Sequence, residues 1–209
     1  GRRSNGIQNR QAEGHQTAAA QAGVTFVEKI LEAKRITPAK LALFASRAFG
    51  VPLEGLHTET GPGVYEAAIA FSEALEQADR AILFKTGARE IGKRYGIMPS
   101  FMAKWNQQYP GCSGHLHQSL SDGKKNLFYD AKSPHSMSKL FESYLAGQVA
   151  CLMEFAPMFW PTINSYKRLV DGFWAPVKPT WGLDNRTASF RVIAGSPKAT
   201  RLETRCPGA

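Results

Sequence analysis

Apolar residues follow a near-helical spacing in three stretches of the chain. These stretches are residues 24–48, 79–95 and 133–155. Thr37-Pro38 predicts a helix start within the first stretch, and Asp79 and Ser133 are the predicted N-caps of the other two. Gly96 is the expected C-terminal stop of the second helix, because glycine adopts the left-handed conformation that ends a helix. The apolar face of the second helix comprises Ile82, Leu83, Thr86 and Ile91. The third helix is rich in Leu, Met, Phe and Ala, so we expect it in the core.

Shorter stretches of β-branched, aromatic or alternating residues predict strands. They are residues 51–56, 98–105, 126–129, 187–194 and 201–206. Gly61-Pro-Gly63 is a turn signal, so Glu59 and Glu66 are expected to converge on adjacent antiparallel strands. Ser121-Asp-Gly-Lys124 predicts a second turn. A loop rich in Pro, Gly and Trp spans residues 171–183, and it either covers a ligand or packs as a structural loop.

Two histidines separated by one residue, His115 and His117, follow a glycine-bearing loop. On a strand both would project to the same face, and glycine would let the backbone approach a ligand closely. Such a pair either holds metal or phosphate, or simply belongs to a surface strand. The flanking charged residues are Glu59, Glu66, Arg186, Arg191, Arg201, Glu203 and Arg205. Carboxylates and histidine hold divalent cations and arginines hold phosphates, so this set suits a metal–nucleotide complex.

The segment Arg201-Leu-Glu-Thr-Arg205 carries charge on alternate positions. In a strand Arg201, Glu203 and Arg205 share one face. The alternatives are a salt-bridged face turned to solvent and a charged functional site.

Composition narrows the class of protein. Of 209 residues, 43% are hydrophobic and 21% charged, as in a soluble globular protein. No apolar run approaches the roughly 20 residues of a membrane span, and the N-terminal segment lacks the apolar core of a secretory signal. Three distant cysteines fit neither a disulfide framework nor a zinc site, so we expect a cytoplasmic protein.

Positive charge is concentrated near the start of the sequence. The net charge is +9, and residues 1–50 supply +5 of it. We expect residues 1–46 to form a basic, polar leader and residues 47–209 the domain. Such a leader would suit nucleic acid, but no aromatic residue is interleaved with the arginines of residues 1–22, which favours a solvated tail. We therefore expect no nucleic-acid partner and no membrane partner.

Five motifs follow one another along the chain. They are His57-Thr-Glu-Thr-Gly-Pro-Gly-Val-Tyr-Glu66, Phe101-Met-Ala-Lys104 with residues 111–120, Asn164-Ser-Tyr-Lys-Arg-Leu169, Asn185-Arg-Thr-Ala-Ser-Phe-Arg191 and Arg201-Leu-Glu-Thr-Arg-Cys-Pro207. In this order they resemble the glutamine synthetase family and its relatives that join glutamate to other amines. The resemblance covers residues 47–209. It implies an α+β fold, part of a glutamine synthetase-like catalytic domain with an antiparallel sheet or half-barrel and flanking helices.

The resemblance also implies a reaction. ATP phosphorylates the γ-carboxylate of glutamate, and ammonia or a primary amine then displaces phosphate from the γ-glutamyl phosphate. Two anions must approach each other, so Mg²⁺ or Mn²⁺ ions and arginines neutralise the developing charge. Members of the family form ring-shaped homo-oligomers, which implies a dodecamer here.

The roles of the family's residues carry over by motif. Glu59 and Glu66 resemble the ligands of one metal ion, and His115 and Glu203 those of the other. Gly111, Arg168 and Arg205 resemble the glutamate-binding residues. Arg168 and Arg186 resemble the family's catalytic residues, with Arg186 on the transferred phosphoryl group. His117, Ser119, Arg191 and Arg201 resemble its ATP-binding residues.

Three departures from the family pattern lead us to expect a partial catalytic domain that is inactive alone. No Glu-x-Glu pair occurs in the chain. The family's small N-terminal domain, which completes the neighbouring subunit's site, is missing. The sequence stops at Ala209, where the family continues into further helices.

A fourth difference lies inside the 171–183 loop. The family reads Pro-Gly-Tyr-Glu-Ala-Pro where this chain reads Asp171-Gly-Phe-Trp-Ala-Pro176. Trp174 therefore replaces a glutamate that helps ammonium lose a proton, and an indole accepts no proton near neutral pH. The hypothesis is a preference for a primary alkylamine, such as a polyamine or an amino alcohol. The alternative is that Trp174 packs into the core and another residue does the glutamate's work.

Two other classes of function are alternatives to a ligase. A non-catalytic structural relative would account for the missing ligands, but the retained acidic and basic residues argue against it, because unpaired buried charges are costly. An RNA-binding protein would rest on the net charge alone.

Overall fold

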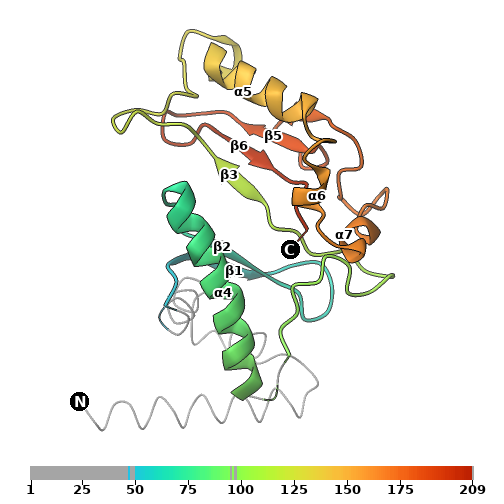
Figure 1. Cartoon of the computed structure of the whole chain (residues 1–209). Coiled ribbons are helices and arrows are strands. Elements are labelled where there is room, and N and C mark those ends of the chain that lie inside the picture. The colour runs from blue at the N-terminus through green and yellow to red at the C-terminus, as the bar shows by residue number, and fades with distance from the viewer. Residues whose placement is uncertain (1–46, 48–49, 95, 97, 209) are drawn as a thin grey trace, which may run out of the picture. The chain divides into compact units, whose positions relative to one another are not determined.

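The computed structural model of the protein describes residues 47, 50–94, 96 and 98–208 (Figure 1). The chain divides into two compact units, residues 1–99 and 100–209. The first contains β1 (Leu53–Thr58), β2 (Tyr65–Ile69) and α4 (Ala74–Arg94). The second contains β3 (Leu116–Gln118), the 3-10 helix η1 (Pro134–Ser136), α5 (Lys139–Ala150), α6 (Ala156–Phe159), α7 (Ile163–Lys167), β4 (Trp181–Leu183), β5 (Phe190–Ile193) and β6 (Arg201–Thr204). The predicted α+β class is confirmed. The predicted helix over 24–48 lies outside the described residues.

The two strands of the first unit form an antiparallel hairpin. His57 pairs with Glu66 across β1 and β2. The predicted turn at Gly61-Pro-Gly63 connects them, and Gly63 has a φ of +71°, which favours glycine. The Glu59 N–H donates to the Val64 carbonyl at 2.9 Å and closes the turn. The predicted convergence of Glu59 and Glu66 on this hairpin is thereby confirmed, with Glu59 one residue beyond β1.

Helix α4 begins five residues earlier than predicted. The Gln77 N–H donates to the Glu73 carbonyl at 2.8 Å, so Asp79 is an interior residue and its prediction as N-cap is wrong. The Ala-Leu-Glu-Gln-Ala run of residues 74–78 has high helix propensity, which explains the early start. The predicted glycine stop is confirmed, since Gly96 has a φ of +68°. Ile82 and Leu83 are exposed, so this part of the predicted apolar face is not buried.

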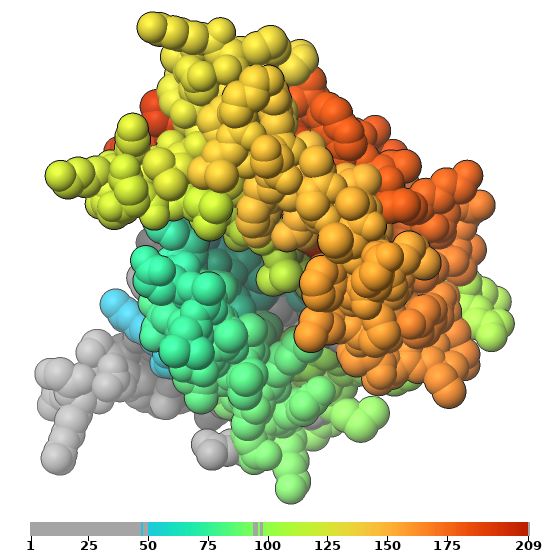
Figure 2. All heavy atoms as spheres, turned by 45° about the horizontal axis from the view of Figure 1, so that its top comes forward, coloured from blue at the N-terminus to red at the C-terminus, as the bar shows by residue number. Residues whose placement is uncertain are grey.

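A four-stranded sheet organises the second unit, in the order β3-β6-β5-β4. Strands β3 and β5 are antiparallel to β6, whereas β4 runs parallel to β5. The parallel pairing of β4 with β5 differs from the expected antiparallel sheet. Helix α5 lies along one face of the sheet (Figure 1) and forms part of the near surface in Figure 2. The core between helix and sheet contains Phe141, Leu145, Phe190, Val192 and Leu202. Alternation along β5 and β6 therefore leaves Arg191 and Glu203 on the opposite face.

The predicted helix over 133–155 is two separate helices. His135 has a φ of +56° inside η1, which interrupts the helix that Ser133 was expected to cap. Ser138 caps α5 instead, because its side chain accepts from the Phe141 N–H at 3.1 Å. The predicted burial of this stretch is confirmed by Phe141 and Leu145.

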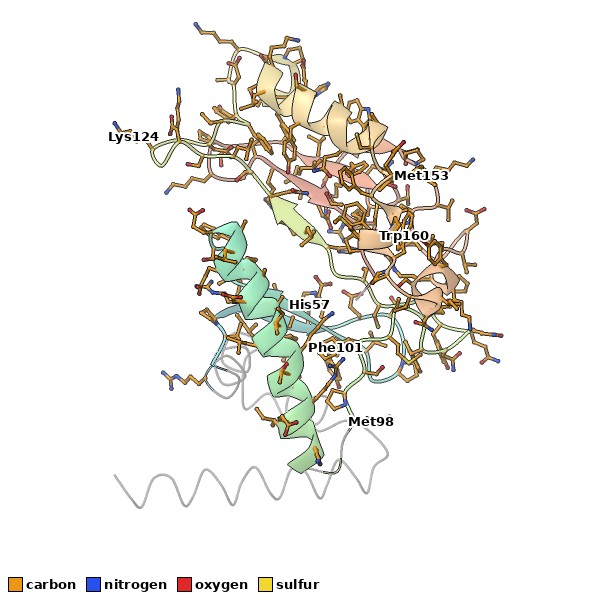
Figure 3. The ribbon with its side chains drawn as sticks, in the orientation of Figure 1. His57, Met98, Phe101, Lys124, Met153 and Trp160 are labelled. Atoms are coloured by element: carbon orange, nitrogen blue, oxygen red, sulfur yellow. The ribbon has the colours of Figure 1, made fainter. Side chains whose placement is uncertain are left out.

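Two predicted strands are absent from the described residues. Residues 98–105 form none, because the N–H and carbonyl of Lys104 bind the side-chain amide of Asn164, both at 2.9 Å, and not a neighbouring strand. Residues 126–129 form only isolated bridges. The predicted turn before them is confirmed, and Lys124 projects outward from it (Figure 3).

Candidate active site

The carboxylate of Glu203 is the centre of a charged cluster on the polar face of the four-stranded sheet. Glu203 lies on β6 and is only 2% exposed. Arg205 Nη1 donates to its Oε1 at 2.6 Å, and Arg191 Nη1 donates to its Oε2 at 3.0 Å. His115 Nδ1 lies 3.2 Å from Oε1. Burial raises the pKa of Glu203, but Arg205 and the neighbouring cations outweigh burial and hold the pKa below its ordinary value. The carboxylate therefore stays ionised.

The two histidines share the face that the sequence predicted. His117 on β3 pairs with Glu203 on β6, and its Nε2 lies 3.9 Å from the carboxylate. His115 immediately precedes β3 and also faces Glu203. Burial, assisted by the charge of Arg205, lowers the pKa of His115 to about 4. Its imidazole is therefore neutral at neutral pH, the form in which histidine binds metal ions.

Three of the predicted ATP-binding residues, His117, Arg191 and Arg201, contact this cluster or one another. Arg201 Nε donates to His117 Nδ1 at 3.0 Å. Arg191 also bonds to Asp184, a carboxylate in the loop before β5. Ser119 lies exposed one residue after β3, and Arg186 lies exposed in the same loop as Asp184. In the described part of the chain, neither of these two residues hydrogen-bonds to Glu203.

Arg168 and Arg205, two of the residues predicted to bind glutamate, are both buried. Arg168 is 4% exposed and donates only to main-chain oxygens, those of Cys206 at 3.1 Å and Arg205 at 3.3 Å. No carboxylate of the described residues pairs with Arg168. Burial lowers its pKa to about 10, so the guanidinium remains charged at neutral pH. Arg205 Nε is buried without a hydrogen-bond partner. These two side chains can bind an anion.

Gly111 lies directly against Arg168. A Cβ added at Gly111 would lie 2.1 Å from the Ala103 carbonyl oxygen and 2.9 Å from Arg168 Cγ. No side chain fits at this position without displacing backbone. The glycine thus allows residues 103 and 111 to pack together beside the arginine.

The first unit holds its own group of potential ligands. His57, Glu59 and Glu66 each offer one ligand atom, and these atoms all lie within 4.8 Å of one another. His57 is labelled in Figure 3. Burial, followed by the nearby Glu59, raises the pKa of Glu66. Sequence reasoning identified the two glutamates but missed His57, although the His-x-Glu spacing was a signal for a shared face.

The 171–183 loop presents Trp174 to solvent. Trp174 is 63% exposed and has a φ of +59°, so it does not pack into the core, contrary to the alternative. With Asp171, Val177 and Lys178 it lines a cavity of about 370 Å³. The ring of the neighbouring Phe173 makes a cation–π contact with Lys104. Lys104 is buried, and the sequence analysis assigned it no role.

Comparison with known proteins identifies the family. A model of the glutamine synthetase catalytic domain matches residues 3–209. This chain belongs to the glutamine synthetase family. The predicted resemblance is thereby confirmed, and the chain is a member of a family of glutamate–ammonia and glutamate–amine ligases. The matched range begins inside the predicted leader, whose boundary at residue 46 stays a prediction.

The chain is similar to three relatives in the glutamine synthetase family that are named for different activities. It is 63% identical over 165 residues to type-1 glutamine synthetase 2 of Dictyostelium discoideum, covering 78% of this chain and 32% of the relative. It is 42% identical over 164 residues to glutamate–isopropylamine ligase of Pseudomonas sp, covering 78% and 36%. It is 40% identical over 160 residues to γ-glutamylethanolamide synthetase of Streptomyces coelicolor, covering 76% and 34%. The chain spans about a third of the length of these relatives.

None of the described helices is both long and apolar enough to cross a membrane.

Proposed function

We propose that the complete protein uses ATP to join the γ-carboxylate of glutamate to a primary amine or ammonia, through γ-glutamyl phosphate. The observation that carries the proposal is the pairing of a buried, ionised Glu203 with a set of buried cations on one face of the sheet. Bringing a phosphoryl donor to a carboxylate requires such compensation of negative charge. The sheets described here would form part of the family's half-barrel.

Glutamate would bind at Arg168 and Arg205, beside Gly111. Arg205 has an unpartnered Nε, and Arg168 donates only to neutral carbonyls. A carboxylate of the substrate would pair with Arg168, which has no carboxylate partner among the described residues. It would also accept from Arg205 Nε, since that guanidinium already pairs with Glu203 through Nη1. Gly111 would hold this backbone close to Arg168, because the Ala103 carbonyl and Arg168 Cγ occupy the place of its missing side chain.

The nucleotide would bind next to the Glu203 cluster. Arg191 and Arg201, with His117 and Ser119, would contact ATP, and the exposed Arg186 would contact the transferred phosphoryl group. The guanidinium group suits this role, because its planar donors match phosphate oxygens in pairs.

The donor atoms fit divalent cations. Glu59 and Glu66 supply two carboxylates close enough to share an ion, and His115 and Glu203 supply a neutral imidazole beside an ionised carboxylate. These sets would hold Mg²⁺ or Mn²⁺, one ion each. When bound, the ions would draw negative charge from the phosphate oxygens.

We propose an organic primary amine as the preferred nucleophile. Trp174 offers an apolar wall and a cation–π face, worth about 0.5–2 kcal/mol for an alkylammonium, but no proton acceptor. Asp171 is among the residues that line the cavity beside it, and its carboxylate would attract the ammonium head. Two relatives are named for isopropylamine and ethanolamide, which supports the preference. The relative with 63% identity is named a glutamine synthetase, so ammonia is the alternative nucleophile.

We further propose a cytoplasmic homo-oligomer, a dodecameric ring by analogy with the family. Exposed apolar side chains on and beside α4, such as Phe71 and Leu75, support an interface. Light scattering of the full-length protein tests this proposal, and a monomer at high concentration would contradict it.

The activity is tested by phosphate release from the full-length protein with ATP, glutamate and Mg²⁺. A panel of ammonia, isopropylamine, ethanolamine and a polyamine ranks the nucleophiles by kcat/KM. We expect an organic amine to exceed ammonia, and Trp174→Glu to shift the preference toward ammonia. Superior activity with ammonia, or an unchanged preference in Trp174→Glu, would reject the amine assignment. The absence of release with every amine would favour the non-catalytic relative.

A further inference from the structure

The hairpin of the first unit presents an imidazole between two carboxylates. His57 on β1 lies directly opposite Glu66 on β2, and Glu59 follows two residues after His57. His57 Nε2 is 3.6 Å from Glu59 Oε1 and 3.4 Å from Glu66 Oε2. All three side chains are about half exposed, so an ion from solvent can reach them.

These separations match chelation better than direct pairing. Hydrogen bonds between nitrogen and oxygen are roughly 2.7–3.2 Å long, shorter than either contact of His57. Ligand atoms bound about 2.1 Å from one ion at angles of about 90–110° lie roughly 3.0–3.5 Å apart. The 3.4 Å contact to Glu66 falls within this range, and the 3.6 Å contact to Glu59 is just above it. The single Nε2 atom lies near both carboxylates, as a ligand sharing their ion would.

We propose that His57 is a third protein ligand of the ion held by Glu59 and Glu66, and that its nitrogen biases this site toward Mn²⁺ over Mg²⁺. Mg²⁺ prefers oxygen ligands in a regular octahedron, whereas imidazole binds transition metals more readily. The inference rests on the proposed metal site but not on the ligase reaction. In the contrasting case, His57 is only a charge partner of the two carboxylates.

Metal affinity distinguishes these cases in the full-length protein. Mn²⁺ binding is measured from the electron paramagnetic resonance signal of free Mn²⁺, and Mg²⁺ binding by competition. We expect His57→Ala to weaken Mn²⁺ binding about tenfold, equivalent to about 1.4 kcal/mol, and Mg²⁺ binding less than about threefold. His57→Asp exchanges nitrogen for oxygen and should favour Mg²⁺ relative to the wild type. The control is His135→Asn, which removes an exposed histidine elsewhere; it should change neither affinity.

A spectroscopic measurement tests ligation directly. His115 is proposed for the other ion, so the background is His115→Ala. Pulsed electron paramagnetic resonance of bound Mn²⁺ should then still show coupling to an imidazole nitrogen, and adding His57→Ala should abolish it. Absence of nitrogen coupling in His115→Ala, or an unchanged ratio of Mn²⁺ to Mg²⁺ affinity in His57→Ala, would overturn the proposal. Neither measurement depends on turnover, so a failure of the proposed ligase activity would be seen separately.

Discussion

Lys104 Nζ lies 4.3 Å from the centre of the Phe173 ring. The same ammonium donates to the Tyr109 carbonyl at 2.6 Å, and Lys104 is almost completely buried. Phe173 immediately precedes Trp174 in the loop that borders the proposed amine cavity. A buried cation on a distant segment therefore fixes the position of that loop.

Lys104→Met should loosen the loop while keeping the apolar stem of the side chain. Loss of a cation–π contact of about 0.5–2 kcal/mol should raise the KM for the amine by about 2- to 30-fold, and more than the KM for glutamate. Phe173→Leu should have a similar effect, and the double variant should be no worse than either single variant. Independent, additive effects of the two substitutions in steady-state kinetics would refute this coupling.

Arg168→Lys should weaken glutamate binding with little effect on ATP. A lysine cannot reproduce the planar donors of a buried guanidinium, and a hydrogen bond to a charged group contributes about 1.5–3 kcal/mol. We expect the glutamate Kd, measured by calorimetry, to rise about 10- to 100-fold. Lys167→Arg changes the exposed neighbour and is the matched control. Equal glutamate affinity in Arg168→Lys and wild type would exclude this role.

Glu203→Gln should be far more destabilising than the same substitution at Glu142. Glu203 is buried against two arginines. Its neutralisation leaves the buried Arg205 without a carboxylate partner among the described residues, at a cost of about 3–5 kcal/mol, whereas Arg191 keeps Asp184. Glu142 pairs with Lys139 at 2.7 Å on an exposed surface, where such pairs contribute about 0–1 kcal/mol. Urea unfolding of both variants measures the difference. Similar free energies of unfolding would show that the Glu203 cluster does not stabilise the fold.

Acidification should destabilise the metal-free protein through His115. Its pKa is about 4 in the folded state, against about 6.5 when unfolded. Between these values the unfolded state binds more protons, so the contribution is complete above pH 6.5 and is lost as the pH falls toward 4. We expect a loss of about 2 kcal/mol between pH 7 and pH 5 in EDTA. His115→Asn should show a smaller loss in the same urea titration, and an identical loss would assign the effect to other groups.

Features set by neighbouring residues could be predicted from the sequence. The Gly61-Pro-Gly63 turn follows from local conformational preference, and the shared face of Arg201, Glu203 and Arg205 follows from the period of a strand. The early start of α4 was missed because the predicted cap at Asp79 outweighed the helix propensity of the residues before it. Local sequence signals therefore predicted the structure correctly where they agreed. Where an N-cap signal and helix propensity disagreed, the predicted start of the helix was wrong.

Features set by distant residues could not be predicted. The Lys104 backbone binds Asn164, which lies 60 residues away, and this contact replaces a strand that composition favoured. The partners of Arg168 are main-chain oxygens of residues 205 and 206, which no pattern in its own helix indicates.

The pairing of β3 with β6 has a consequence for synthesis of the chain on the ribosome. Gln118 Nε2 donates to Thr204 Oγ1 across a separation of 86 residues. At about 5–20 residues per second, roughly 4–17 s pass after Gln118 is added before Thr204 follows. During that interval the two histidines of the β3 region have no carboxylate of β6 to face. Translation speed thus sets the shortest time after which the histidines of the β3 region can meet Glu203 in the nascent chain.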